Sequence, residues 1–143
     1  MTLTSDFGTS DSYVGAMKGA MLRLAPSLRL VDIGHQIPPQ DVVAGAAVIE
    51  NASPEFPSGT VHLVVVDPGV GTARAPMALL AQGHVWVGPD NGVFSAFLGD
   101  ENTEARRIDP EGVLGPILGT RTSNTFHGRD IFAPVAALLA SGL

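Results

Sequence analysis

The sequence predicts an α/β fold, a Rossmann-like three-layer domain whose mostly parallel central sheet is flanked by helices. The order of the predicted elements and the composition of the chain lead to this prediction. Short apolar runs typical of buried strands alternate with segments whose apolar residues recur at helical spacing, in the order strand, helix, strand, helix, strand. Such alternation favours parallel strands joined by right-handed crossovers. The length of 143 residues suits one compact domain, and 45% apolar against 15% charged residues indicates that much of the chain is buried.

The first half of the chain supplies the alternating elements. A strand is expected at residues 1–7, and a helix follows because Val14, Met17, Met21 and Leu24 recur at helical spacing before Pro26. The next strand is expected at 28–33, a second helix at 40–56 and a third strand, "TVHLVVVD", at 60–67.

The second half of the chain departs from this alternation of strands and helices. Residues 76–82 and 84–88 are expected to form a hairpin around Gly83, followed by a short helix at 92–99 and a strand at 105–109. The segment from Pro110 to Gly128 is rich in proline and glycine, so a loop is expected there. An alanine-rich helix is expected from about Asp130.

Composition excludes several classes of function. The net charge is −6 with 8 Lys and Arg, and no basic run is present, which argues against nucleic-acid binding. The chain has no cysteine, which removes disulfides and thiolate chemistry. No apolar stretch approaches the roughly 18 residues of a membrane span, and the first residues lack the pattern of a signal peptide. We expect a cytoplasmic protein without membrane contact.

Acidic residues follow the predicted strands. Asp6, Asp32 and Asp67 come at or near the ends of three strands, and Asp90 with Asn91 follows "HVWVG". Because the carboxyl ends of parallel strands share one edge of a sheet, we expect these side chains to line one rim, where ligands bind in open α/β sheets. The alternative for each acid is a turn or a helix cap.

The stretch "NTFHGRDIFAP" is the other candidate site. Imidazole as a group titrates near neutral pH, and His127 lies next to a glycine, a pattern that fits an active-site corner, although a single histidine can also be structural. Arg129 and Asp130 can pair with each other or cap the last helix. "GVGTAR" lacks the third glycine of a dinucleotide fingerprint.

Five stretches together resemble one family. "TSDFGTSDSYVGAMKG", "VDIGHQIPPQDV", "VVVDPGVGTAR", "VGPDNG" and "TFHGRDIFAP", in this order, are similar to the S-adenosyl-L-methionine (SAM) hydroxide adenosyltransferase, or SAM hydrolase, family, whose fold is shared with fluorinases and chlorinases. The resemblance implies hydrolysis of SAM to adenosine and methionine by in-line attack of activated water at the ribose 5′ carbon. It also implies a homotrimer that needs neither a metal nor a cofactor.

The resemblance carries roles to individual residues. It implies a catalytic triad of Asp67, Arg74 and His127, in which either Asp67 or His127 takes the proton. The implied substrate-binding residues are Asp6 at the ribose, Asp11 at the methionine end, Val70, Asn91, Phe126 and Gly128. In halogenating relatives a tyrosine stands at the position of Asp67, and in the fluorinase hydroxyl residues stand at the positions of Val70 and Gly128.

The family also has a second, β-rich domain. Residues 1–143 match its N-terminal domain, so we expect the β-rich domain to be absent from this chain and its pocket to be incomplete. Three alternatives stay open: a non-catalytic SAM- or adenosine-binding or assembly module, a SAM-dependent halogenase, and a metal-dependent phosphate hydrolase.

Overall fold

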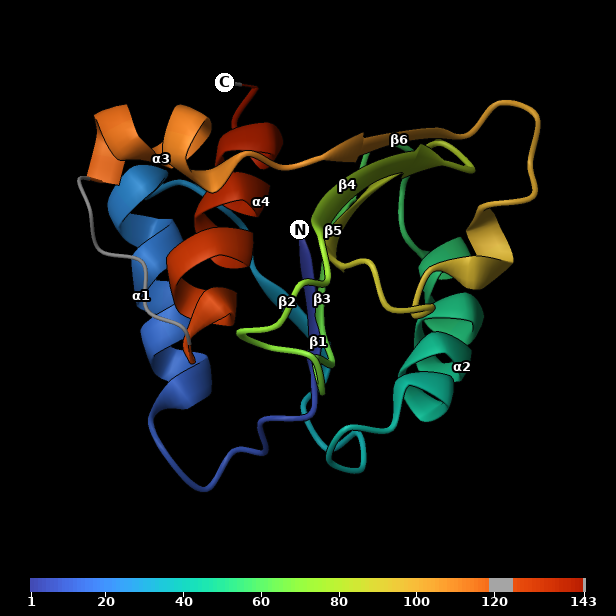
Figure 1. Ribbon diagram of the computed structural model, residues 1–143, viewed down its shortest axis with the longest axis horizontal. Coiled ribbons are helices and arrows are strands. Elements are labelled where there is room, and N and C mark those ends of the chain that lie inside the picture. The colour runs from blue at the N-terminus through green and yellow to red at the C-terminus, as the bar shows by residue number, and fades with distance from the viewer. Residues whose placement is uncertain (119–124, 143) are drawn as a thin grey trace.

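The computed structural model describes residues 1–118 and 125–142, which form one mixed sheet with helices on both faces (Figure 1). The strands are β1 (Thr2–Ser5), β2 (Val31–Gly34), β3 (Val61–Val65), β4 (Pro76–Ala81), β5 (His84–Pro89) and β6 (Glu104–Arg107). Their spatial order is β2-β1-β3-β5-β4-β6. The first four strands in this order run parallel, and β4 runs antiparallel to both of its neighbours. The predicted three-layer α/β fold with a mostly parallel sheet is confirmed.

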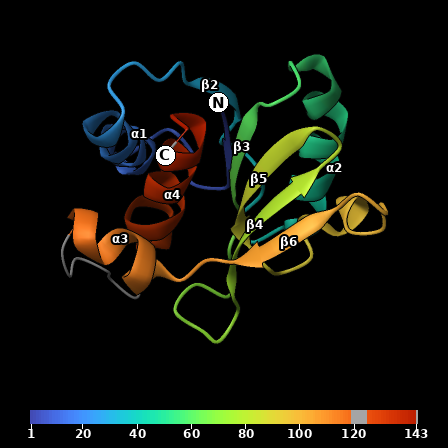
Figure 2. The same ribbon diagram turned by 90° about the horizontal axis from the view of Figure 1, so that it is seen from above.

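The helices divide between the two faces. They are α1 (Tyr13–Leu24), α2 (Val42–Ala52), α3 (Pro110–Leu118) and α4 (Ala133–Ala140), with short 3-10 turns η1 (Ser53–Glu55) and η2 (Ser95–Phe97) and a π-helical turn η3 (Gly128–Phe132). Both ribbon views place α1, α3 and α4 on one side of the sheet and α2 on the other (Figures 1 and 2). No helix among the described residues is long and apolar enough to cross a membrane.

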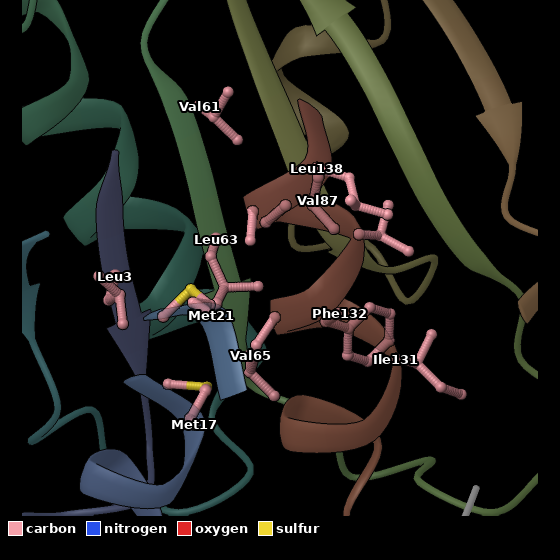
Figure 3. Packing of buried hydrophobic residues seen from close by; sticks show 14 of the residues in the cluster. Leu3, Met17, Met21, Val61, Leu63, Val65, Val87, Ile131, Phe132 and Leu138 are labelled. Atoms are coloured by element: carbon pink, nitrogen blue, oxygen red, sulfur yellow. The ribbon is translucent and has the colours of Figure 1, made fainter. Parts of the chain in front are cut away.

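The larger core fills the space between the sheet and the pair α1 and α4. Leu3, Leu63 and Val65 point from adjacent strands toward Met17 and Met21 of α1, and Phe132 completes the layer (Figure 3). Residues 133–138 are all buried, so α4 is a core helix rather than a surface helix. This burial fixes the position of the segment just before α4, which carries part of the site.

The opposite face has a second core built around one aromatic side chain. Trp86 is fully buried, stacks on Phe97 at 4.2 Å between ring centroids, and packs with Ile49 of α2. The predicted β4–β5 hairpin is also confirmed. Gln82 and Gly83 both have positive φ, 53° and 75°, as a two-residue turn matched to strand twist requires.

Several boundaries differ from the sequence prediction, and the short helix expected at 92–99 is only the 3-10 turn η2. The loop expected between Pro110 and Gly128 is wrong over its first part, because Pro110–Leu118 is α3; residues 119–124 lie outside the described part of the chain. Proline is well tolerated at the first helical position, and Asp109 Oδ1 accepts a hydrogen bond from Gly112 N at 3.2 Å. The final helical segment begins at Gly128 rather than Asp130, and the second strand is Val31–Gly34 rather than 28–33.

Gly88 of β5 lies where no side chain fits. A Cβ there would be 2.4 Å from the backbone oxygen of Val64 and 2.9 Å from Cζ of Phe94. Because the Val64 carbonyl belongs to a central strand, we expect Gly88→Ala to lower the free energy of unfolding by about 1–3 kcal/mol, as overpacking does. Urea unfolding measures it. The matched control is Gly19→Ala on α1, where a Cβ meets nothing within 4 Å; equal stability of the two variants would contradict the prediction.

Candidate active site

The candidate site is a small cavity at the carboxyl ends of the central parallel strands. Its volume is about 60 Å³, and its walls include Asp6, Phe7, Val65, Asp67, Val70 and Gly128. This space holds a few water molecules and is too small for a nucleoside. Four of the residues predicted from the sequence therefore meet here, namely Asp6, Asp67, Val70 and Gly128.

Asp67 follows β3 and is paired with Arg74. Arg74 Nε donates to Asp67 Oδ1 at 2.9 Å and to Oδ2 at 3.1 Å, and Nη2 also donates to Oδ2. The Asp67 side chain is only 5% exposed, and the Arg74 side chain is 9% exposed. A buried carboxylate requires such a partner, because desolvation without one is costly. The acid at the end of an apolar strand is therefore compensated within its own loop.

The loop between Asp67 and Arg74 turns back on itself. Val70 N donates to Asp67 O at 3.2 Å, and Thr72 N donates to Gly69 O at 3.0 Å. Gly71 has φ 78°, which a side chain would disfavour. These turns return the chain so that Arg74, seven residues on, reaches the carboxylate that begins the loop.

His127 reaches the same guanidinium from the other end of the chain. It directly precedes η3, and its Nδ1 lies 2.7 Å from Nη2 of Arg74. Phe132, at the end of η3, lies beneath the guanidinium, with Arg74 Cζ 5.2 Å from the ring centroid. The buried helix segment therefore holds both His127 and the aromatic surface on which Arg74 rests.

Asp6 is positioned by the loop that follows β2. Its Oδ2 accepts a hydrogen bond from Gln40 N at 2.7 Å, and Gly8 N donates to His35 O at 2.7 Å. Gln40 has φ 65°, an unusual conformation for a residue with a side chain. These hydrogen bonds join the two loops at the rim, where Asp6 lines the cavity.

Asp32 belongs to a polar network around the buried His35 rather than to the cavity wall. It accepts from Lys18 Nζ at 2.6 Å and lies 2.9 Å from His35 Nε2, while His35 Nδ1 lies 2.7 Å from Ser5 Oγ. Burial alone would raise the pKa of Asp32, but the hydrogen bonds and charges of Lys18 and His35 outweigh it and lower the pKa. The sequence offered only the position of His35 after β2, which did not distinguish a structural from a functional histidine.

The remaining candidates do not line the cavity. Asn91 Nδ2 donates to Val66 O at 2.8 Å, which fixes the backbone directly before Asp67. Asp11 is exposed and accepts from Tyr13 N at 3.1 Å at the start of α1. Phe126 packs against Tyr13, with ring centroids 5.7 Å apart, and under the guanidinium of Arg129.

Arg129 and Asp130 pair with each other, as one of the two sequence interpretations held. Arg129 Nε donates to Asp130 Oδ1 at 2.6 Å, and this contact raises the pKa of Arg129. Within the described ranges, 1–118 and 125–142, no three His, Asp or Glu side chains come together as metal ligands would.

The fold and the Asp–Arg–His arrangement define an α/β domain with a polar site at the carboxyl ends of its parallel strands. The chain belongs to the SAM hydroxide adenosyltransferase N-terminal domain family, whose model matches residues 1–143. It is 46% identical over 145 residues to the (R)-S-adenosyl-L-methionine hydrolase of Salinispora arenicola, covering 99% of this chain and 53% of that protein.

The chain is also similar to a more distantly related protein and to a solved structure. A fluorinase of Actinoplanes sp. is 30% identical over 162 residues, covering 96% of this chain and 53% of that protein. The crystal structure of an uncharacterized conserved protein from Thermotoga maritima matches with a TM-score of 0.90 and 39% identity, covering 99% of this chain and 54% of that one. The chain thus spans about half the length of the relatives that it matches.

Proposed function

We propose that this chain carries the water-activating part of an active site that hydrolyses SAM to adenosine and methionine. The observation that carries the proposal is the buried Asp67–Arg74 pair, which is joined to His127 through Arg74 and whose carboxylate residue, Asp67, lines a water-sized cavity together with Asp6. The name of the Salinispora relative supports the substrate. The homotrimeric assembly and the cytoplasmic location belong to the same proposal.

The proposed reaction places few demands on the protein. Water attacks the ribose 5′ carbon, the new C–O bond forms as the C–S bond breaks, and the electron pair of that bond stays on sulfur. Because a sulfonium leaves as a neutral thioether, the leaving group needs no acid. The site must hold the water in line, remove its proton and stabilise the developing hydroxide, which buried donors and a nearby base do well.

Asp6 supports the proposed placement of the substrate. A carboxylate at the rim can accept hydrogen bonds from two neighbouring ribose hydroxyls, and its fixed position beside the cavity would hold the 5′ carbon near the water. Adenine and methionine would extend beyond this small cavity. The isolated chain is therefore expected to bind substrate loosely and to turn it over poorly, since a misplacement of about 1 Å can cost on the order of 10²-fold.

The test is hydrolysis of SAM in water enriched in oxygen-18. The 143-residue chain is assayed alone and fused to the part of the Salinispora relative that it does not cover, with and without a chelator. We expect adenosine that carries one oxygen-18 atom, unlabelled methionine, no effect of the chelator and much faster turnover in the fusion. Absence of turnover in both forms would favour the binding or assembly module, and loss of activity with chelator would favour the metal-dependent hydrolase.

Removing the Asp6 carboxylate is expected to weaken binding more than turnover. Asp6→Ala should raise KM for SAM and lower adenosine affinity while leaving kcat within a few-fold, because ribose contacts act on substrate and transition state alike. The matched control is Asp100→Ala, an exposed carboxylate outside the cavity wall. Calorimetric titration with adenosine measures affinity, and unchanged affinity in Asp6→Ala would contradict the ribose role.

Fluoride and chloride are not expected to replace water. The cavity wall carries the Asp67 carboxylate, and a halide beside it would meet a like charge. Val70 and Gly128 offer no side-chain hydroxyl to hold an anion. Mass spectrometry of reactions at saturating halide should find adenosine and no 5′-halo-5′-deoxyadenosine; detection of the halogenated nucleoside would favour the halogenase alternative.

A further inference from the structure

The contact between Arg74 and His127 determines which ring nitrogen of the histidine carries the proton. We infer that His127 is held as the neutral tautomer protonated at Nε2, so that it donates a hydrogen bond in the site, and that Asp67 accepts the proton of the attacking water. The second half of this inference rests on the proposed function, whereas the first half does not.

The first step concerns the donors of Arg74. A guanidinium has five N–H donors and no acceptor. Its Nη2 lies 2.7 Å from His127 Nδ1, so the hydrogen of this bond comes from the arginine and Nδ1 accepts it with its lone pair. A nitrogen that accepts in this way carries no proton, and in a neutral imidazole the proton is then on Nε2.

The second step concerns the Arg74 guanidinium, which its contacts hold in one orientation. One hydrogen of Nη2 is directed to Asp67 Oδ2, and Nε donates to both carboxylate oxygens. The other hydrogen of Nη2 is therefore the one that faces His127 Nδ1. The guanidinium lies over the Phe132 ring, and its side chain is 9% exposed, so rotation away from the histidine would break a buried ion pair.

The two other states of the ring conflict with this geometry. A proton on Nδ1, in the other tautomer or in the imidazolium, would face an arginine N–H across 2.7 Å. The imidazolium would also place a second positive charge beside the guanidinium that Asp67 already pairs with. In the neutral Nε2–H form, the contacts of Arg74 with Asp67 and with His127 are all donor–acceptor pairs.

The consequence is a division of roles within the three residues. Arg74 donates only, and the lone pair of neutral His127 is occupied by Arg74, so neither accepts a proton from water. The carboxylate of Asp67 has about four acceptor positions and lines the cavity, and Arg74 occupies only some of them. As the C–O bond forms, the water proton passes to Asp67 and from there to solvent, while donors stabilise the charge on the attacking oxygen.

The tautomer is tested on the 143-residue chain itself by nitrogen-15 NMR of labelled histidine at pH 8, with His127 assigned through its own bonds to the backbone. We expect an unprotonated, pyridine-type shift for Nδ1, a pyrrole-type shift for Nε2, and a scalar coupling between Nδ1 and the Arg74 guanidinium across their hydrogen bond. Arg74→Met should abolish the coupling and move both shifts toward the averaged values of exchanging tautomers. A pyrrole-type Nδ1, or averaged shifts in the unchanged chain, would overturn the inference.

The proton transfer is tested separately, in whichever form of the protein turns over SAM. His127→Gln keeps an amide donor but has no group that titrates near neutral pH, so kcat should fall only modestly and its pH profile should keep the acid limb of the parent. Loss of that limb would identify His127 as the base and overturn the role of Asp67. Absence of turnover in every form would overturn the proposed function together with this role, whereas the tautomer is decided by NMR alone.

Discussion

Asp67→Asn is expected to lower the turnover of SAM by about 10²–10⁴-fold, the range that general-base assistance contributes. Asparagine has the size of aspartate, and its carbonyl oxygen can still accept from Arg74 Nε, which lies 2.9 Å from Asp67 Oδ1. It loses the negative charge, however, and its amide group would face the Nη2 donor of Arg74. The variant therefore removes the proton acceptor and loosens the guanidinium while leaving the ribose side of the cavity unchanged.

The matched control is Asp90→Asn, which makes the same change of charge at an exposed acid that follows β5. Single-turnover rates and adenosine affinity are measured for both variants in the active form of the protein. We expect Asp67→Asn to keep its adenosine affinity within a few-fold and Asp90→Asn to resemble the parent in both measurements. A loss below about tenfold, or a parallel loss of affinity and rate, would show that Asp67 is structural.

The gathering of acids at one rim follows from the strand pattern alone. Asp6 and Asp67 end neighbouring parallel strands, and the register that pairs Ser5 with Val65 brings their side chains to one edge. Hydrophobic runs define such strands well, and parallel pairing then determines which ends meet. This part of the site could be predicted from sequence because it depends on topology rather than on packing detail.

The partners of these acids could not be predicted in the same way. Asp32 was expected at the end of the second strand, but it is the second residue of β2, and its carboxylate contacts Lys18 and His35 and does not line the cavity. The contact of Arg74 with His127 spans 53 positions in the chain and depends on how α4 packs into the core. Periodicity and composition contain no information on such side-chain geometry; the family resemblance placed these two residues together, and their catalytic roles stay predictions.

The α3 helix shows a different limit of sequence reasoning. Its segment contains Pro110, Gly112, Gly115 and Pro116, which by count favour a loop. The first proline occupies a position where a helix does not need its N–H, and Leu114 is buried, so packing stabilises a helix that intrinsic propensity disfavours. Counting helix-breaking residues without their position in the turn led to the error.

Acidification is expected to destabilise the fold through His62, at the end of the sheet opposite the site. This side chain is fully buried, stacks on Trp86 at 4.3 Å between ring centroids, and lies 2.7 Å from Thr2 Oγ1 through Nδ1 and 3.1 Å from His84 Nδ1 through Nε2. Desolvation by burial, with a smaller contribution from the charge on His84, lowers the pKa of His62 from 6.5 to about 4. Desolvation also lowers the pKa of His84.

The sign of this pH effect depends on whether the folded or the unfolded chain binds the proton. Between pH 6.5 and about 4 the unfolded chain protonates His62 and the folded chain does not, so the stabilising contribution is complete above pH 6.5 and is lost as the pH falls through this window. The difference between a pKa of 6.5 and one of about 4 corresponds to about 3 kcal/mol of the free energy of unfolding. Roughly 2 kcal/mol of this contribution is lost by pH 5.

Urea unfolding at pH 7 and pH 5 measures this loss, and His62→Gln is the matched variant, because its amide can accept from Thr2 and donate to His84 without titrating. We expect the free energy of unfolding of the parent chain to fall by roughly 2 kcal/mol over this interval and that of the variant to fall much less. At pH 7 the variant should be the less stable of the two, because it lacks the stacking of His62 on Trp86. The lowered pKa of Asp32 affects stability only at pH values near or below the ordinary carboxyl pKa of 3.8, outside this interval. Equal pH dependence in parent and variant would assign the acid sensitivity to another group.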